Sequence, residues 1–236
     1  MKEKIMCNNH SSKVPHTHVN PNILIIKQTE EFVYKKLSGE GTGHDWYHID
    51  RVRKLALHIA KQEKANLFII ELAALLHDIA DWKFHNGDES VGPRVAGEWL
   101  KSLNVSKDII EDVCDIIATI SFKGGHAKSS MKTIEGMIVQ DADRLDALGA
   151  IGIARCFAYG GYKGNPIYDP KVLPTQHQSF EEYKKIRGSS VNHFYEKLLL
   201  LKDCMNTQAA RAIANQRHKL MEQFLEEFYK EWNCSL

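Results

Sequence analysis

Apolar residues recur at three- and four-residue steps through almost the whole chain from residue 22 onward. Ile49, Val52 and Leu55 follow this spacing, which places them on one face of an amphipathic helix. The sequence contains no convincing run of alternating apolar and polar residues and no hairpin turn signal of the kind that a β-sheet requires. It therefore predicts an all-α fold, a single-domain helical bundle whose helices bury their apolar faces against one another.

The helical pattern divides into segments with recognisable end signals. Gly39 is a plausible C-cap, Ser106 and Thr133 are plausible N-caps, and Gly160-Gly161 is a plausible stop. We expect helices over residues 22–39, 44–64, 67–80, 92–104, 106–121, 133–161, 190–206 and 207–232. Residues 161–180 are rich in Gly, Pro and Tyr and predict a loop, either a wall or lid of a substrate site or a flexible insertion.

The composition limits the domain organisation and the compartment. Residues 1–21 are polar and lack helical periodicity, so we expect a disordered extension followed by one domain over residues 22–236. A chain of 236 residues of which 43% are hydrophobic is long enough to bury the core of one large domain. The extension has no apolar signal-peptide core, and the five cysteines form no CxxC pair. These features predict a cytoplasmic protein with free thiols.

The charge and hydropathy patterns argue against two classes of partner. The formal net charge is +1, whereas a protein that follows a nucleic-acid polymer normally carries a basic stripe. No apolar run reaches the roughly 18 residues that a membrane-spanning helix needs. We therefore expect neither a nucleic-acid polymer nor a membrane as partner, and homo-oligomer formation stays open.

Ionisable residues interrupt three of the apolar segments at inward positions. His77 and Asp78 follow the apolar run LFIIELAALL, while His48 and Asp143 each share a helix face with apolar residues. Asp141 lies on a different face and could be solvated. Two imidazoles and two carboxylates suit a divalent ion with open coordination positions, such as Mn²⁺, Fe²⁺, Mg²⁺ or Zn²⁺. The alternative is a set of independent buried ion pairs.

These residues, read with their neighbours, resemble a known family. The segments HDWYHIDRV, LAALLHDIADWKF, QDADRLDALGAIGIAR and HFYEKLL are similar to those of the small bacterial hydrolases of the HD-domain metal-dependent phosphohydrolase superfamily, over roughly residues 23–232. The resemblance implies an HD-type helical bundle. Some members of that group hydrolyse nucleoside triphosphates to monophosphate and pyrophosphate, usually with Mn²⁺. The resemblance implies that the metal ligands are His48, His77, Asp78 and Asp143.

The resemblance also separates the ligand pair from a second His-Asp pair and sets the number of ions. His44-Asp45 falls outside the ligand set that the resemblance implies. Many relatives have a histidine in the segment that reads IIATISFKGG here, where Thr119 and Ile120 precede Ser121. We therefore expect one divalent ion, with Mn²⁺ first and Mg²⁺, Fe²⁺ or Zn²⁺ as alternatives.

An in-line attack at phosphorus needs a group that positions the water and cations that hold the phosphates. Asp81 is the candidate for orienting or deprotonating the water, and Arg51 and Lys83 are the candidates for phosphate contacts. His193 and Lys197, four residues apart, could add cationic contacts, and Tyr162 could stack on a base. Each of these side chains has an ordinary surface or helix-end role as its alternative.

The resemblance thus implies an enzyme that hydrolyses nucleoside or deoxynucleoside triphosphates to monophosphate and pyrophosphate. A phosphomonoesterase or phosphodiesterase that acts on another small phosphorylated metabolite is the alternative within the same class. A metal or nucleotide sensor without enzymatic activity is the alternative from another class. An intact ligand set together with Asp81 favours the enzyme, because a degenerate binding module is expected to have lost at least one of these residues.

Overall fold

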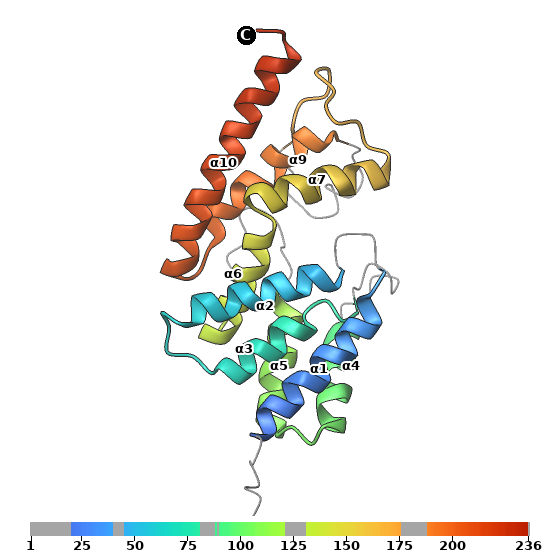
Figure 1. Cartoon of the computed structure of the whole chain (residues 1–236), viewed down its shortest axis with the longest axis vertical. Helices are drawn as coiled ribbons and strands as arrows, with labels where there is room; N and C mark the ends of the chain where they lie inside the picture. The colour runs from blue at the N-terminus through green and yellow to red at the C-terminus, as the bar shows by residue number, and fades with distance from the viewer. Residues whose placement is uncertain are drawn as a thin grey trace, which may run out of the picture.

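The computed structural model of the chain describes residues 20–39, 45–80, 88, 90–120, 131–175 and 188–235. The predicted disordered extension lies almost entirely outside these residues. Within them, every regular element is a helix, which confirms the all-α prediction (Figure 1). No helix of the described residues is long and apolar enough to cross a membrane.

The elements follow the predicted segments closely at some ends and depart from them at others. In chain order they are α1 (Pro21–Leu37), α2 (Trp46–Ala60), α3 (Leu67–Leu76), α4 (Val91–Ser102), α5 (Lys107–Thr119), α6 (Ile134–Asp146), α7 (Gly149–Lys163), α9 (Ser190–Glu196), the 3-10 helix η2 (Leu198–Cys204) and α10 (Gln208–Trp232). Thr133 caps α6 as expected, because its side chain accepts from the N–H of Gly136.

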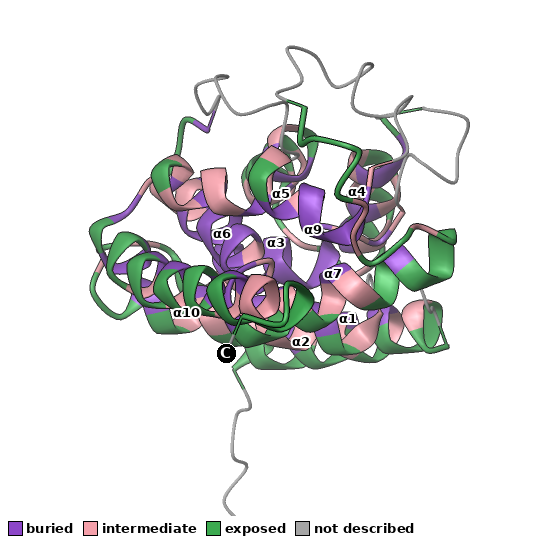
Figure 2. Ribbon diagram, turned by 90° about the horizontal axis from the view of Figure 1, so that it is seen from above, coloured by how far each residue is buried: buried purple, intermediate pink, exposed green. Residues whose placement is uncertain are grey.

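Helix α3 forms the centre of the bundle. Its sequence is apolar on nearly every side, and all residues from Leu72 to Leu76 are buried. Helices α1, α2, α5 and α6 pack around it, and Figure 2 shows α3 and α6 as buried ribbon enclosed by partly exposed helices. Asn66 begins the helix by accepting from the N–H groups of Phe68 and Ile69. The C-terminal end of α3 lies inside the bundle, so the residue that follows it, His77, is buried.

The prediction of one helix over 133–161 is wrong, because the chain bends between α6 and α7. Gly149, the first residue of α7, has φ +72°, a left-handed conformation that residues with a Cβ adopt only with strain. The Gly160-Gly161 pair does not end α7, which continues to Lys163 and is capped by Gly164 at φ +67°. Because of the bend, α7 leaves the end of α6 at a steep angle and runs above α2 (Figure 1).

Other boundaries also depart from the prediction. The expected helix over 190–206 divides into α9 and η2 at Lys197, whose φ of −143° is not helical. The expected helix over 67–80 ends at Leu76, and residues 77–80 form turns. The C-cap of α1 is Ser38, although Gly39 follows with φ +89°. Of the predicted loop 161–180, residues 161–163 belong to α7 and residues 165–175 are non-helical.

Candidate metal centre

The four side chains that the sequence singles out come from three helices that meet. His48 lies in the first turn of α2, His77 is the C-cap of α3 with Asp78 directly after it, and Asp143 lies in α6. Asp45 begins α2 by accepting from the N–H of His48 at 2.9 Å. Asp45 thus caps the helix that carries His48, while His44 lies outside the described residues.

The potential ligand atoms converge on one point. The two imidazole Nε2 atoms lie 3.2 Å apart. The Nε2 of His48 lies 3.3 Å from an oxygen of Asp78 and 3.5 Å from an oxygen of Asp143. For His77 Nε2 the corresponding distances are 3.4 and 3.9 Å. Ligands at about 2.0–2.2 Å from a metal lie roughly 3–3.6 Å from one another, so the cluster has the size of a first coordination shell.

The hydrogen bonds at the far side of each ring fix which nitrogen faces the cluster. His77 Nδ1 lies 2.9 Å from the carbonyl oxygen of Ala74, which can only accept, so Nδ1 carries a proton. His48 Nδ1 lies 2.8 Å from a carboxylate oxygen of Asp146 and donates to it in the same way. In the neutral rings both Nε2 atoms therefore present lone pairs toward each other and toward two carboxylates.

A cation is the group that fits among four acceptors. Two lone pairs at 3.2 Å repel unless a proton or metal lies between them. The side chains of Asp78 and Asp143 are 19% and 34% exposed, whereas both imidazoles are buried. The cluster is thus closed on its imidazole side and open on its carboxylate side, as a site with exchangeable positions requires. His48, His77 and Asp78 form a His-His-Asp set that can hold a metal ion.

Without a metal, protons are drawn to the same place. Burial by itself would lower the pKa of His77, but the charge of Asp78 and its hydrogen bond, with the charge of Asp143, raise that pKa to about 9. Burial also opposes protonation of His48, yet hydrogen bonds with Asp146 and Asp78 raise its pKa. The local field therefore favours positive charge at the point where the ligand atoms meet.

Asp146 organises the surroundings of the cluster and was not assigned a role from the sequence. Its carboxylate is buried and accepts from His48 at 2.8 Å, from Arg155 Nη1 at 2.7 Å, and from Arg51 Nε and Nη2 at 2.7 and 3.0 Å. Burial would raise the pKa of Asp146, but the bonds with His48 and Arg51 hold it well below its usual range. Its position three residues after Asp143, on nearly the same helix face, is a signal that could have indicated it.

Two arginines from different helices therefore flank the cluster. Arg51 lies on α2 and Arg155 on α7, and Asp146 bridges them. Both side chains are partly exposed. Their guanidinium groups meet at one carboxylate beside His48 Nδ1, and the guanidinium group is the side chain best suited to bind phosphate oxygens.

The other candidates from the sequence fall into three groups. Asp81 and Lys83 lie outside the described residues. Tyr162 lies in the last turn of α7, where its ring is exposed. His193 and Lys197 lie at the end of α9, which packs on α7. Burial and the neighbouring charge of Lys197 lower the pKa of His193 to about 3, so its imidazole is neutral and does not offer the expected cationic contact.

Asp141 is buried, so the interpretation that it could be solvated is wrong. Its carboxylate accepts from the backbone N–H groups of Asn206 and Thr207 and from both of their side chains, all at 2.8 or 2.9 Å. These residues lead into α10, whose N-cap is Thr207. Asp141 therefore joins α6 to the start of α10 and has no role in the ligand cluster.

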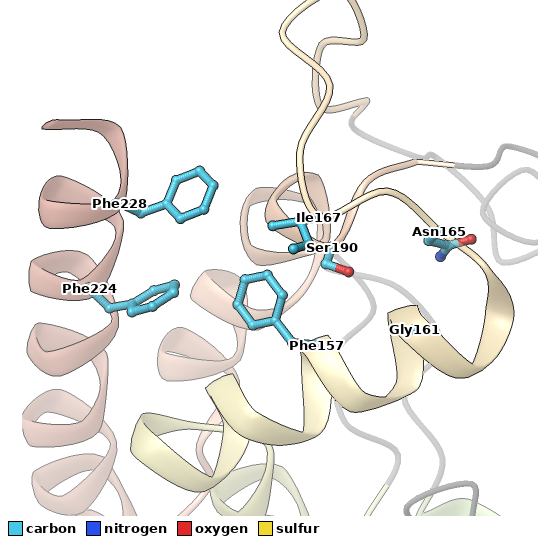
Figure 3. A pocket seen from close by; sticks show the side chains of 7 residues that line it. All are labelled: Phe157, Gly161, Asn165, Ile167, Ser190, Phe224 and Phe228. Atoms are coloured by element: carbon cyan, nitrogen blue, oxygen red, sulfur yellow. The ribbon is translucent and has the colours of Figure 1, made fainter. Parts of the chain in front are cut away.

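A separate hollow lies between α7 and α10. Its volume is about 460 Å³, and Figure 3 shows aromatic side chains from both helices facing it. Its lining residues are Phe157, Gly161, Asn165, Ile167, Ser190, Phe224 and Phe228. Phe157 lies two positions after Arg155 on α7 and so points to a different side of that helix. Because no lining side chain is ionisable, this hollow is not where the metal chemistry lies.

Comparisons with known proteins identify the family. The family model of the HD domain matches residues 45–148, a range that contains all four candidate ligand residues. The chain is 41% identical over 211 residues to the uncharacterised protein YpgQ of Bacillus subtilis (strain 168), covering 87% of this chain and 94% of the relative.

Two solved structures are similar over most of their length. A crystal structure of an HD-superfamily hydrolase from Bacillus thuringiensis matches with a TM-score of 0.71 at 50% identity, covering 90% of this chain and 98% of that one. The crystal structure of B. subtilis YpgQ in complex with ADP matches with a TM-score of 0.71 at 36% identity, covering 90% of this chain and 97% of that one.

Proposed function

We propose a nucleotide-hydrolysing function for this chain, which belongs to the HD-domain phosphohydrolase superfamily. The proposed substrate is a nucleoside or deoxynucleoside triphosphate, and the products are the monophosphate and pyrophosphate. The observation that carries the proposal is the convergence of two imidazole nitrogens and two carboxylates beside the arginine pair that Asp146 bridges. The ADP complex of the relative YpgQ supports a nucleotide as the ligand.

We assign one Mn²⁺ ion to His48, His77, Asp78 and Asp143. A mixed set of imidazole and carboxylate ligands suits Mn²⁺, and the same set can also accept Fe²⁺, Mg²⁺ or Zn²⁺. When bound, such an ion supplies a Lewis acid for phosphoryl oxygens and acidifies a water. The absence of cysteine from the ligand set argues against a structural zinc site.

The side chains around the ligands bind and orient the substrate in this proposal. Arg51 and Arg155, which are partly exposed, provide positive charge for the phosphate oxygens. Asp81 accepts the proton of the attacking water, and Lys83 holds a second phosphate; they follow the ligand Asp78 by three and five residues in the sequence.

We assign two further substrate contacts to the end of α9. Lys197 binds a phosphate as a cation. His193, which is neutral because its pKa is low, offers a hydrogen bond in place of a charge.

The test is a product assay with matched histidine variants. Metal-free protein is incubated with Mn²⁺ and a panel of nucleoside triphosphates, deoxynucleoside triphosphates, monophosphates and guanosine tetraphosphate, and the products are resolved by ion-exchange chromatography. We expect pyrophosphate and monophosphate from the wild type and from His58→Ala, but not from His77→Ala. His58 is the control because it is an exposed histidine in the last turn of α2.

The same assay separates the alternatives. Free phosphate released from monophosphates would replace the proposal by a phosphomonoesterase. Mn²⁺ binding without turnover of any compound in the panel would replace it by a sensor. Equal turnover by His77→Ala and the wild type would contradict the assignment of His77 to the reaction.

A further inference from the structure

Helix α7 reaches the metal centre through Arg155 and then continues away from it. Arg155 Nη1 lies 2.7 Å from the Asp146 carboxylate that also holds His48. The helix extends for two more turns, to Lys163, and Figure 1 shows it running above α2. Residues four and seven positions further along a helix lie within about 40° of the starting residue. Tyr159 and Tyr162 therefore share the face of α7 that carries Arg155.

Both tyrosine rings are exposed on that face. Tyr159 is 46% and Tyr162 is 62% exposed. Lys163 Nζ lies 5.5 Å from the ring centre of Tyr159 and 5.1 Å from that of Tyr162, within the range of a cation–π interaction. One ammonium group therefore contacts both rings. The result is an aromatic pair that adjoins the arginine side of the metal centre.

The nearby Tyr168 shows what a structural tyrosine looks like in this fold. Its ring packs edge-on against Phe228, Tyr229 and Trp232 of α10, with ring centres 5.0–5.9 Å apart. Tyr168 thus helps to fasten the segment after α7 to α10. The ring contacts of Tyr159 and Tyr162, by contrast, are with a lysine of their own helix. Exposed aromatic rings beside a charged site are typical of ligand contacts rather than of a core.

We propose that the face of α7 formed by Arg155, Tyr159, Tyr162 and Lys163 binds the nucleoside end of the substrate, an assignment that rests on the proposed nucleotide hydrolase function. Arg155 contacts the phosphates next to the metal centre. Tyr162 lies seven residues further on, roughly 10 Å along the helix axis, a span that an extended phosphate chain and ribose can bridge. The base then stacks on the tyrosine rings. These rings can accept any of the bases, because every base has a π-face.

The experiment compares a nucleotide with an inorganic anion that lacks the nucleoside. Isothermal titration calorimetry in the presence of Mn²⁺ gives the Kd of ADP and the Kd of pyrophosphate for each protein. We expect the double variant Tyr159→Ala/Tyr162→Ala to raise the ratio of the ADP Kd to the pyrophosphate Kd by roughly tenfold or more. Tyr159→Phe/Tyr162→Phe keeps the rings and should keep the wild-type ratio.

Tyr34→Ala is the matched control, because Tyr34 is 52% exposed on α1, which carries none of the ligand residues. An unchanged ratio in the double alanine variant would overturn the assignment to α7 and leave the nucleotide hydrolase proposal intact. A wild type that binds pyrophosphate but not ADP would overturn both. A raised ratio in a protein that turns over no nucleotide would support the nucleoside site while refuting the hydrolase.

Discussion

Replacing Asp146 by asparagine tests whether this carboxylate holds the metal centre in place. One oxygen of Asp146 accepts from Arg51 Nε, and the other accepts from His48, Arg51 and Arg155. An asparagine must place an NH₂ group at one of these positions, where it meets a donor. The oxygen is expected to take the position with three donors, so that the NH₂ group meets only Arg51 Nε.

The cost follows from the bonds that change. A hydrogen bond to a charged group contributes roughly 1.5–3 kcal/mol. In the variant at least one such bond is lost, and the acceptor of the remaining bonds is a neutral amide oxygen instead of a carboxylate. The two guanidinium groups are partly exposed, so that solvent screening reduces the remaining loss. We expect Asp146→Asn to lower the free energy of unfolding of the metal-free protein by about 2–3 kcal/mol, measured by urea denaturation with a chelator present.

The same change should weaken metal binding. Asp146 fixes the ring orientation and tautomer of His48, and loss of such a partner typically lowers metal affinity by about 10–100-fold. Calorimetric titration with Mn²⁺ measures this effect. Asp141→Asn is the matched control, since Asp141 is equally buried in α6 and accepts four hydrogen bonds, but from the residues that begin α10. It should lose stability and keep its Mn²⁺ affinity.

Wild-type Mn²⁺ affinity in Asp146→Asn would refute the claim that Asp146 positions His48. Equal losses of affinity in both variants would attribute the effect to general destabilisation of α6.

Further predictions concern protonation, the bend and the core. The pKa of His77 in the metal-free protein is raised from 6.5 to about 9. The stabilisation that the protonated His77 ring gives to the folded state is therefore complete below about pH 6.5 and is lost as the pH rises through about 9. Because Mn²⁺ needs the unprotonated ring, Mn²⁺ should raise Tm more at about pH 8 than at about pH 6; equal shifts in thermal melts would contradict this. Gly149→Ala places a side chain at φ +72° and 3.0 Å from Arg217 Cγ, and should lower the unfolding free energy by about 1–2 kcal/mol in urea. Leu72→Ala, at a fully buried position of α3, should cost about 2–5 kcal/mol in the same assay, and a change below 1 kcal/mol would contradict the central place of that helix.

Helical spacing predicted the inward direction of the ligand residues because it is a local property of the chain. His48 is buried on the face that its apolar neighbours define, and His77 lies at the end of the most apolar segment. The existence of most helices followed in the same way. The bend at Gly149 did not, because a glycine inside an apolar run also fits a continuous helix, and only the packing of α7 decides between the two.

The residues that surround the ligands depend on contacts between distant parts of the chain. His48 and Asp146 are 98 positions apart, and no spacing rule connects them. Asp141 looked solvated because its helix face differs from that of Asp143, yet the start of α10 covers it and supplies hydrogen bonds. The role of Arg155 depends on the bend that returns α7 to α6.

The most direct test of the central claim is the stoichiometry of Mn²⁺ binding, measured by electron paramagnetic resonance on chelator-stripped protein. Two buried imidazoles whose Nε2 atoms lie 3.2 Å apart, each within 3.9 Å of an oxygen of Asp78 and of Asp143, predict one tightly bound Mn²⁺ per chain. Binding should be lost in Asp78→Ala and retained in His58→Ala. Wild-type binding by Asp78→Ala, or no bound Mn²⁺ in the wild type, would contradict the claim that these side chains form a metal centre.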